Sequence, residues 1–279
     1  MSAVISRLLL YPVKGCRGIA ARSASLAPTG LAVGGIGDRE WVVVDDHGEF
    51  LSQRELPRMA RIGTSLTGTA LRLSAPGMPT LDIAFESAGD AIRVRVWDDE
   101  LDGITQGELA DRWFTDFLGH GSRLIRFDPR ARRLSQRRYT GATAAPYKFA
   151  DAFALLVTSE GSLADVNKRL HAKGQAPVDI DRFRPNIVID GVERFEEDYA
   201  RDLRVGDVLL ELVKPCVRCT VPSVDPATGE QGTEPGDTLA TYRNKPAAGG
   251  VTFGVNAIVA RGAETELRVG DPVELTLRF

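Results

Sequence analysis

The sequence predicts a mainly β fold with a few helices, of the β-barrel kind with antiparallel connections. Three observations support this class. Short β-branched or alternating runs recur along the 279 residues, tight turns separate them, and the regularly spaced helices of a parallel α/β sheet do not follow them. The first hundred residues contain almost only such runs and look like a small all-β unit.

The predicted strands are bounded by turn residues such as Pro76-Gly77. In the first half they cover residues 4–13, 39–46, 70–74, 80–85 and 91–98. They resume at residues 153–158, 186–190, 208–213 and 273–279. Arg-Val-Gly-Asp precedes an alternating strand at both 204–207 and 268–271, and each copy predicts a Gly-Asp turn that leads into the strand.

Two helices are predicted from their apolar spacing. The stripe of the first helix, at residues 106–118, contains Leu109, Trp113 and Phe117. The second helix covers residues 163–172. Ser162 and Asp165 have the spacing of a capping box, which predicts that this helix begins directly after Ser162.

Residues 128–148 interrupt the pattern of strands and turns. This segment has little apolar periodicity and carries Arg130, Arg132, Arg133, Arg137 and Arg138. We interpret it as a long exposed loop between two halves of the chain. It is either a solvated linker, or a basic flap over an anionic ligand or a docking patch for an acidic protein.

The amino-acid composition excludes several classes of protein. Hydrophobic residues make up 43% and charged residues 26%, which excludes a disordered tail and a disulfide scaffold. Acidic residues outnumber basic ones by 38 to 35, so no overall basic field attracts nucleic acid or an anionic membrane. No run approaches the length of a membrane span, and residues 1–20 lack the features of a signal peptide. We therefore expect a cytoplasmic protein.

The three cysteines are Cys16, Cys216 and Cys219, and the last two form a Cys-x-x-Cys pair. Zinc usually needs four N or S ligands, and a second ligand pair is missing. A thioredoxin-like dithiol opens a helix in a βαβ unit, whereas turn residues soon follow this pair. The other interpretations are buried inert thiols, or one thiolate that ligates a soft metal such as molybdenum while Arg218 binds an anionic group beside it.

Five separated motifs resemble those of proteins with a MOSC domain, which is named after the C-terminal domain of molybdenum cofactor sulfurases. In the second half they are CVRCTVPSVDPATG at 216–229, RFRPNIVID at 182–190 and LRVGDPV at 267–273. In the first half, YPVKGC at 11–16 and GDREW at 37–41, followed by QRELP at 53–57, resemble the β-barrel domain that precedes MOSC in the amidoxime-reducing family. The resemblance implies two β-barrel-like domains, a MOSC-associated N-terminal barrel at 1–128 and a MOSC barrel at 129–279.

The resemblance also implies a molybdenum cofactor, whose pterin carries a phosphate and a dithiolene, bound between the two domains. Cys219 would ligate the molybdenum and so be the catalytic residue. The implied cofactor-binding positions are Lys14, Gly15, Arg39, Thr158, Ser159, Arg184, Asn186, Arg218 and Asn256. Gly15 stands where relatives often have Ser, which leaves only its backbone N–H as a donor.

The activity implied by the resemblance is molybdenum-dependent reduction of N-hydroxylated or N-oxide compounds such as amidoximes. The chain ends at Phe279 without further cysteines for an iron–sulfur domain. We therefore expect electrons from a separate ferredoxin-like or flavoprotein donor. The alternative is a non-catalytic carrier of the cofactor or its sulfur, which would use the same cysteine and arginines. A cofactor-free β-barrel binding module would require all five motifs to be coincidental.

Overall fold

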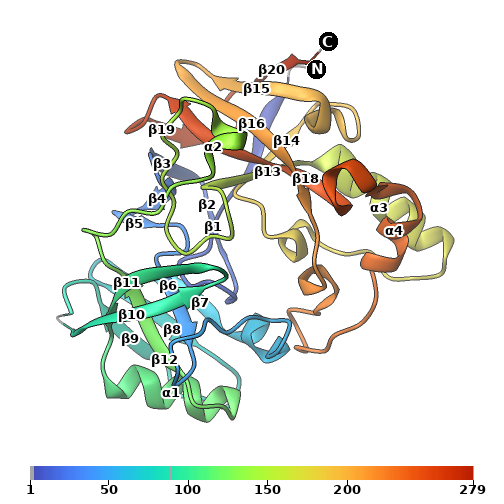
Figure 1. Cartoon of the computed structure of the whole chain (residues 1–279). Helices are drawn as coiled ribbons and strands as arrows, with labels where there is room; N and C mark the ends of the chain where they lie inside the picture. Colours follow the sequence, from blue (N-terminus) through green and yellow to red (C-terminus); the bar gives the residue numbers. More distant parts are fainter. Residues whose placement is uncertain (1–2, 88, 279) are drawn as a thin grey trace.

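The largest sheet takes strands from both ends of the chain (Figure 1). In the computed structural model, which describes residues 3–87 and 89–278, nine strands belong to it. Their spatial order is β2 (Ile19–Ala21), β1 (Val4–Leu10), β14 (Ile187–Asp190), β13 (Leu155–Ser159), β18 (Gly250–Arg261), β16 (Val208–Val217), β15 (Ala200–Val205) and β20 (Glu274–Leu277), with β17 (Asn244–Lys245) paired to β18.

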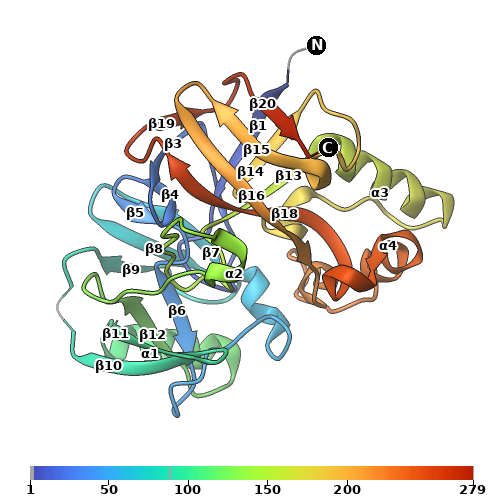
Figure 2. The same cartoon turned by 45° about the horizontal axis from the view of Figure 1, so that its top comes forward.

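The first strand is built into the second half of the molecule. β1 pairs antiparallel with β14, with Val4 opposite Asp190, whereas β13 and β14 are parallel. Figure 2 shows β1 among the strands of the later half. Residues 1–128 and 129–279 therefore share this sheet, and the predicted boundary between them stays a prediction.

Three smaller sheets make up most of the first half. One contains β10 (Ala91–Val96), β11 (Asp99–Thr105), β12 (Arg123–Phe127) and β6 (Trp41–Val44). A second contains β19 (Glu266–Arg268), β3 (Ser23–Ala27), β4 (Gly30–Val33) and β5 (Ile36–Gly37). The third contains β7 (Gly63–Leu66), β8 (Ala70–Ser74) and β9 (Leu81–Ala84). The predicted mainly β fold is confirmed.

The predicted strands are all found, and their ends differ from the predictions by up to four residues. β8 has the predicted bounds, and the last residue of the strand predicted at 273–279 lies outside the described residues. The Gly206-Asp207 turn joins β15 to β16 as a two-residue hairpin loop, with Val205 opposite Val208. β10 shows why such sequences form strands, because buried Val94 and Val96 alternate with exposed arginines.

The helices are α1 (Glu108–Leu118), α2 (Arg137–Thr140), α3 (Glu160–Ala172) and α4 (Gly236–Arg243). α1 ends at Gly119, whose left-handed backbone (φ 68°) forms the C-cap. Trp113 and Phe117 are buried under the first-half sheets, but Leu109 is 68% exposed, so its assignment to the apolar stripe was wrong. The residue lies in the first turn of α1, where the chain enters the helix from solvent.

The capping box predicted at the start of α3 was also wrong. α3 begins at Glu160 because Ser159, the last residue of β13, is already the N-cap and accepts a hydrogen bond from the Ser162 backbone N–H. Asp165 instead pairs with Arg169 and Arg194. α3 and α4 contact each other on the outer side of the large sheet (Figure 1). Among the described helices, none is long and apolar enough to cross a membrane.

The basic segment at 128–148 is only partly the exposed loop that was predicted. Arg132, Arg137 and Arg138 are exposed. Arg133 is buried because its guanidinium pairs with Asp99 at 2.8 Å and donates to two backbone carbonyl oxygens. This arginine anchors the segment to the β10–β11 hairpin, so it is not part of any exposed patch.

Candidate functional site

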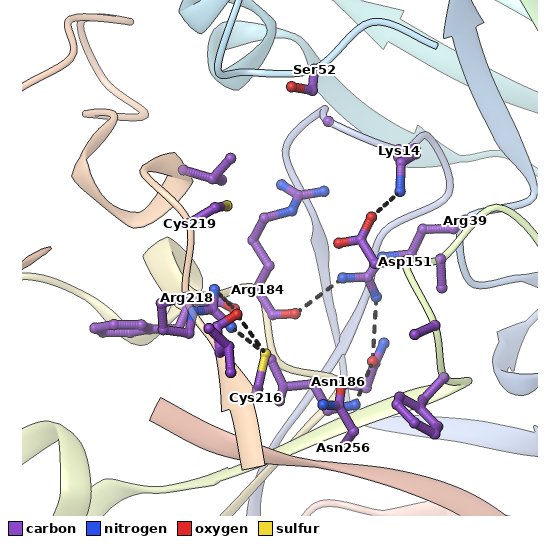
Figure 3. Close-up of a pocket in the computed structure, with 18 of the residues that line it drawn as sticks. Lys14, Arg39, Ser52, Asp151, Arg184, Asn186, Cys216, Arg218, Cys219 and Asn256 are labelled. Atoms are coloured by element: carbon purple, nitrogen blue, oxygen red, sulfur yellow. Dashed lines mark hydrogen bonds and ion pairs between the residues drawn. The ribbon is translucent and has the colours of Figure 1, made fainter. Parts of the chain in front are cut away.

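A cavity of about 280 Å³ lies between the first half of the chain and the large sheet (Figure 3). The first half contributes the loop after β1, Arg39 before β6, residues 50–54 after β6 and the tip of the β10–β11 hairpin. The second half contributes the start of β13, the turn before β14, the end of β16 and one residue of β18. Ligand sites often form at such junctions between structural units.

Eight of the ten predicted site residues line this cavity, namely Lys14, Gly15, Arg39, Arg184, Asn186, Arg218, Cys219 and Asn256. Thr158 and Ser159 are not part of its wall. Both side chains are fully buried, and Ser159 donates to Glu197 at 3.0 Å while it caps α3. Ser159 thus has structural partners in the core, and the roles of the ten residues stay predictions.

Lys14 is held at the cavity wall by Asp151. Its ammonium donates to Asp151 Oδ1 at 2.5 Å and to the carbonyl oxygen of Phe149 at 2.9 Å. Burial lowers the pKa of Lys14, although the pairing with Asp151 opposes this shift. Desolvation of the Asp151 carboxylate at the cavity wall opposes its ionisation, but Lys14 and a hydrogen bond from Trp97 outweigh this effect and hold the pKa of Asp151 well below its usual value. The Asp151 side chain is 73% accessible and borders the cavity, so a ligand can reach this carboxylate.

Two arginines flank one tyrosine ring at the inner wall. The guanidinium carbons of Arg39 and Arg184 lie 4.4 and 4.3 Å from the centre of the buried Tyr11 ring. Both arginines have positive φ, 46° and 57°, a conformation that side chains other than Gly adopt at a cost. Arg39 pairs with Asp38, and Arg184 donates to the carbonyl oxygen of Cys16 at 2.7 Å. Burial, followed by repulsion from Arg39, lowers the pKa of Arg184.

Cys216 lies at the end of β16 and Cys219 just after the strand, with both cysteines on the cavity wall (Figure 3). Cys216 Sγ accepts a hydrogen bond from Arg218 Nη1 at 3.0 Å. The thiol of Cys219 is exposed and takes part in none of the side-chain hydrogen bonds found among the described residues. Cys16 is buried off the cavity, and burial raises the pKa of its thiol to about 12. Cys219 is therefore the thiol best placed to ligate a metal.

Cations outnumber acids on the wall, which carries Lys14, Arg39, Arg54, Arg184, Lys214 and Arg218 but only Asp151 among the described residues. Arg184 Nη2 and Arg218 Nε are buried and have no hydrogen-bond partner in the part of the chain that the structure describes. A buried donor left in this state costs about 1–3 kcal/mol, so a bound anion would stabilise this wall. An anionic pterin phosphate and a soft metal on Cys219 fit this donor set. In the described part of the chain, no group of three or more His, Cys, Asp or Glu side chains could hold a metal, so nothing there supports a zinc site made of protein ligands alone.

Asp151 and Trp97 are among the wall residues that sequence reasoning missed. Asp151 stands alone in the apolar run from Phe149 to Leu156, and an acidic residue in such a run needs a partner when it is packed. Trp97 follows the alternating run of β10 at a position where a turn residue is expected. The isolated acidic residue and the tryptophan at a turn position could therefore have been noticed in the sequence.

Comparison with known proteins assigns both halves of the chain. Residues 2–121 match the MOSC N-terminal beta barrel domain and residues 144–274 match the MOSC domain. The human mitochondrial amidoxime-reducing component 1 is 34% identical over an alignment of 281 residues that covers 97% of this chain and 82% of that protein. The rat mitochondrial amidoxime reducing component 2 is also 34% identical and covers 96% of this chain and 82% of its own length. Among solved structures, the YUAD protein of Bacillus subtilis aligns over 100% of this chain and 98% of its own, with a TM-score of 0.44 and 10% identity. The chain belongs to the amidoxime-reducing component family, with a MOSC N-terminal β-barrel domain followed by a MOSC domain.

Proposed function

We propose that this protein is a molybdenum-cofactor-dependent reductase of N-hydroxylated and N-oxide compounds, supplied with electrons by a separate redox protein. The observation that carries the proposal is the cavity itself. It combines an exposed thiol, Cys219, with one buried nitrogen each on Arg184 and Arg218 that finds no acceptor among the described residues. Membership of the amidoxime-reducing component family supports the substrate class.

Different residues of the wall would hold different parts of the cofactor. Cys219 would bind the molybdenum through its thiolate, while Lys14, Arg39, Arg184 and Arg218 would hold the pterin and its phosphate. Guanidinium groups suit this task because their planar donors can pair with two oxygens of a phosphate. When bound, the cofactor supplies the two-electron chemistry of the site.

The reaction breaks the N–O bond of the substrate, consumes two electrons and two protons, and yields the reduced nitrogen compound and water. Asp151, ionised at neutral pH because of its low pKa, can accept a hydrogen bond from the amino group of an amidoxime. The Lys14 ammonium fixes the position of that carboxylate through the 2.5 Å contact. Asp151 would therefore orient the substrate rather than donate a proton.

The electron donor would dock beside α2. This helix packs on β16, and the Lys214 ammonium, on the cavity wall, lies 4.9 Å from the centre of the Tyr139 ring in α2. The exposed Arg137 and Arg138 extend from the same helix, which suits an acidic partner. Because Arg133 is buried, it takes no part in this docking.

The decisive experiment measures molybdenum content and activity in the same preparation. Protein from a molybdenum-replete host should contain close to one molybdenum per chain and reduce benzamidoxime with a chemical reductant. Zinc in place of molybdenum would refute the proposal. Stoichiometric molybdenum with no reduction of any N-hydroxylated compound, by any donor, would instead assign the protein as a carrier of the cofactor.

A further inference from the structure

Trp97 occupies a backbone position that favours glycine. The β10–β11 hairpin pairs Val96 with Asp99, so its loop consists of Trp97 and Asp98 alone. Trp97 is the first residue of this two-residue loop and has φ 59°. In two-residue hairpin loops that position commonly takes Gly, because a side chain there is strained by about 1–2 kcal/mol. The contacts of the indole must therefore offset this strain.

The indole is fixed in orientation although it is far from buried. Its Nε1–H donates to Asp151 Oδ1 at 2.9 Å, the Phe50 ring centre lies 4.9 Å from its own, and the Arg54 guanidinium carbon lies 4.3 Å from it. These contacts come from two segments of the chain, because Phe50 and Arg54 lie in the same loop after β6 and Asp151 lies in the second half. The residue nevertheless keeps 42% of its surface exposed and lines the cavity. A rigid, accessible aromatic surface thus faces the space where a ligand would lie.

The cavity wall combines two kinds of chemistry. Its arginines and Cys219 fit an anionic group and a metal, and Phe50, Trp97 and Phe153 add aromatic side chains to the same lining. Flat rings pair favourably with such side chains in stacked or edge-on arrangements.

We infer that Trp97 is a specificity-determining residue that stacks against a flat aromatic ring carried by the N-hydroxylated substrate. This inference rests on the proposed reductase function and adds the shape of the substrate to it. The site would favour N-hydroxylated compounds that carry an aromatic or heteroaromatic ring next to the N–OH group over aliphatic compounds with the same group. The Asp151 contact fixes the indole so that stacking needs little rearrangement.

A binding measurement can test this without turnover. Trp41 is 0% and Trp113 is 4% exposed, so Trp97 is the one tryptophan that a solution ligand can reach. Benzamidoxime added to the oxidised, molybdenum-loaded protein should quench its fluorescence, and acetamidoxime at the same concentration should not. The quenching should be lost in Trp97→Phe and kept in Trp113→Phe, the matched control at a buried tryptophan. Equal quenching by both compounds would overturn the inference.

Kinetics separate stacking from the hydrogen bond to Asp151. Trp97→Phe and Trp97→Leu both lose the indole N–H, but only Trp97→Phe keeps an aromatic ring. Trp97→Leu should raise KM for benzamidoxime about two- to tenfold relative to Trp97→Phe, the range expected for one aromatic pair, with KM for acetamidoxime alike in the two variants. If both variants change both substrates equally, Trp97 acts only through Asp151 and the inference is wrong. If the wild-type protein reduces neither compound, the reductase proposal itself fails, whatever the variants do.

Discussion

Replacing each cysteine of the Cys-x-x-Cys pair in turn separates a single metal ligand from a dithiol. Cys219 is exposed and makes no side-chain hydrogen bond among the described residues, so Cys219→Ser should change the free energy of unfolding by less than about 0.5 kcal/mol. Cys216 accepts a hydrogen bond from Arg218 at 3.0 Å, and Cys216→Ser should cost about 1 kcal/mol. Cys219→Ser should therefore lower the free energy of unfolding less than Cys216→Ser does.

Molybdenum retention should show the opposite order. A serine hydroxyl is a poor substitute for a soft thiolate on molybdenum, so Cys219→Ser should lower the metal content at least tenfold, equivalent to about 1.4 kcal/mol of binding. Cys216→Ser should keep more than half of the metal. Elemental analysis after gel filtration gives the metal-to-protein ratio, and thermal unfolding of the same samples gives stability. Metal retained by Cys219→Ser, or equal losses in the two variants, would refute ligation by Cys219 alone.

Three further predictions concern the charged groups. Arg184→Ala and Arg218→Ala should each weaken cofactor retention by about 1.5–3 kcal/mol. Lys at either position should restore retention only in part, because Lys lacks the planar guanidinium group. Normal molybdenum content in the Ala variants would exclude both arginines as cofactor ligands. The double variant Arg137→Glu/Arg138→Glu should slow turnover with an acidic protein donor and abolish the salt dependence of that turnover. Turnover with a small neutral reductant should stay unchanged. Salt-insensitive turnover of the wild type with the protein donor would contradict docking at α2. Glu40→Gln should destabilise the protein by about 3 kcal/mol at pH 7, because Glu40 pairs with Arg126 and Lys148 in a buried position. Burial raises the pKa of Glu40, but these two cations outweigh it and lower the pKa below its usual 4.5, so the stabilisation is present above pH 4.5 and is lost as the pH falls below it. The difference in unfolding free energy between Glu40→Gln and the wild type should shrink at pH 3, and a constant difference across this range would show that the Glu40 charge does not stabilise the fold.

Local sequence patterns predicted β8 and β10, in which buried and exposed residues alternate, and also the fully buried β6 and β13. They missed the short alternating strand β3 and also β18, the longest strand. Its burial pattern does not alternate, since it runs through the middle of the large sheet between β13 and β16. A continuous apolar run of this kind has no period that distinguishes it from other buried segments.

The residues of the site were likewise predicted only in part from the sequence. Family motifs identified Lys14, Arg39 and Cys219, and these residues line one cavity although they are far apart in the chain. Ser159 was expected among the cofactor-binding residues because a Ser at a helix start fits both anion binding and capping; it lies off this wall and is the N-cap of α3, and its role toward the cofactor stays a prediction. Asp151 was missed because its partner, Lys14, lies 137 residues away.

The pairing of β1 with β14 also determines when the protein can finish folding during its synthesis. At the usual ribosomal rate of about 5–20 residues per second, β14 is made roughly 10–40 s after β1. During that interval Ile5, Leu8 and Leu10, which are buried in the finished core, have no sheet partner in β14 and are open to chaperones or to wrong pairing. Assembly of the cavity therefore waits for the second half of the chain, although Lys14 and Arg39 are made in the first few seconds.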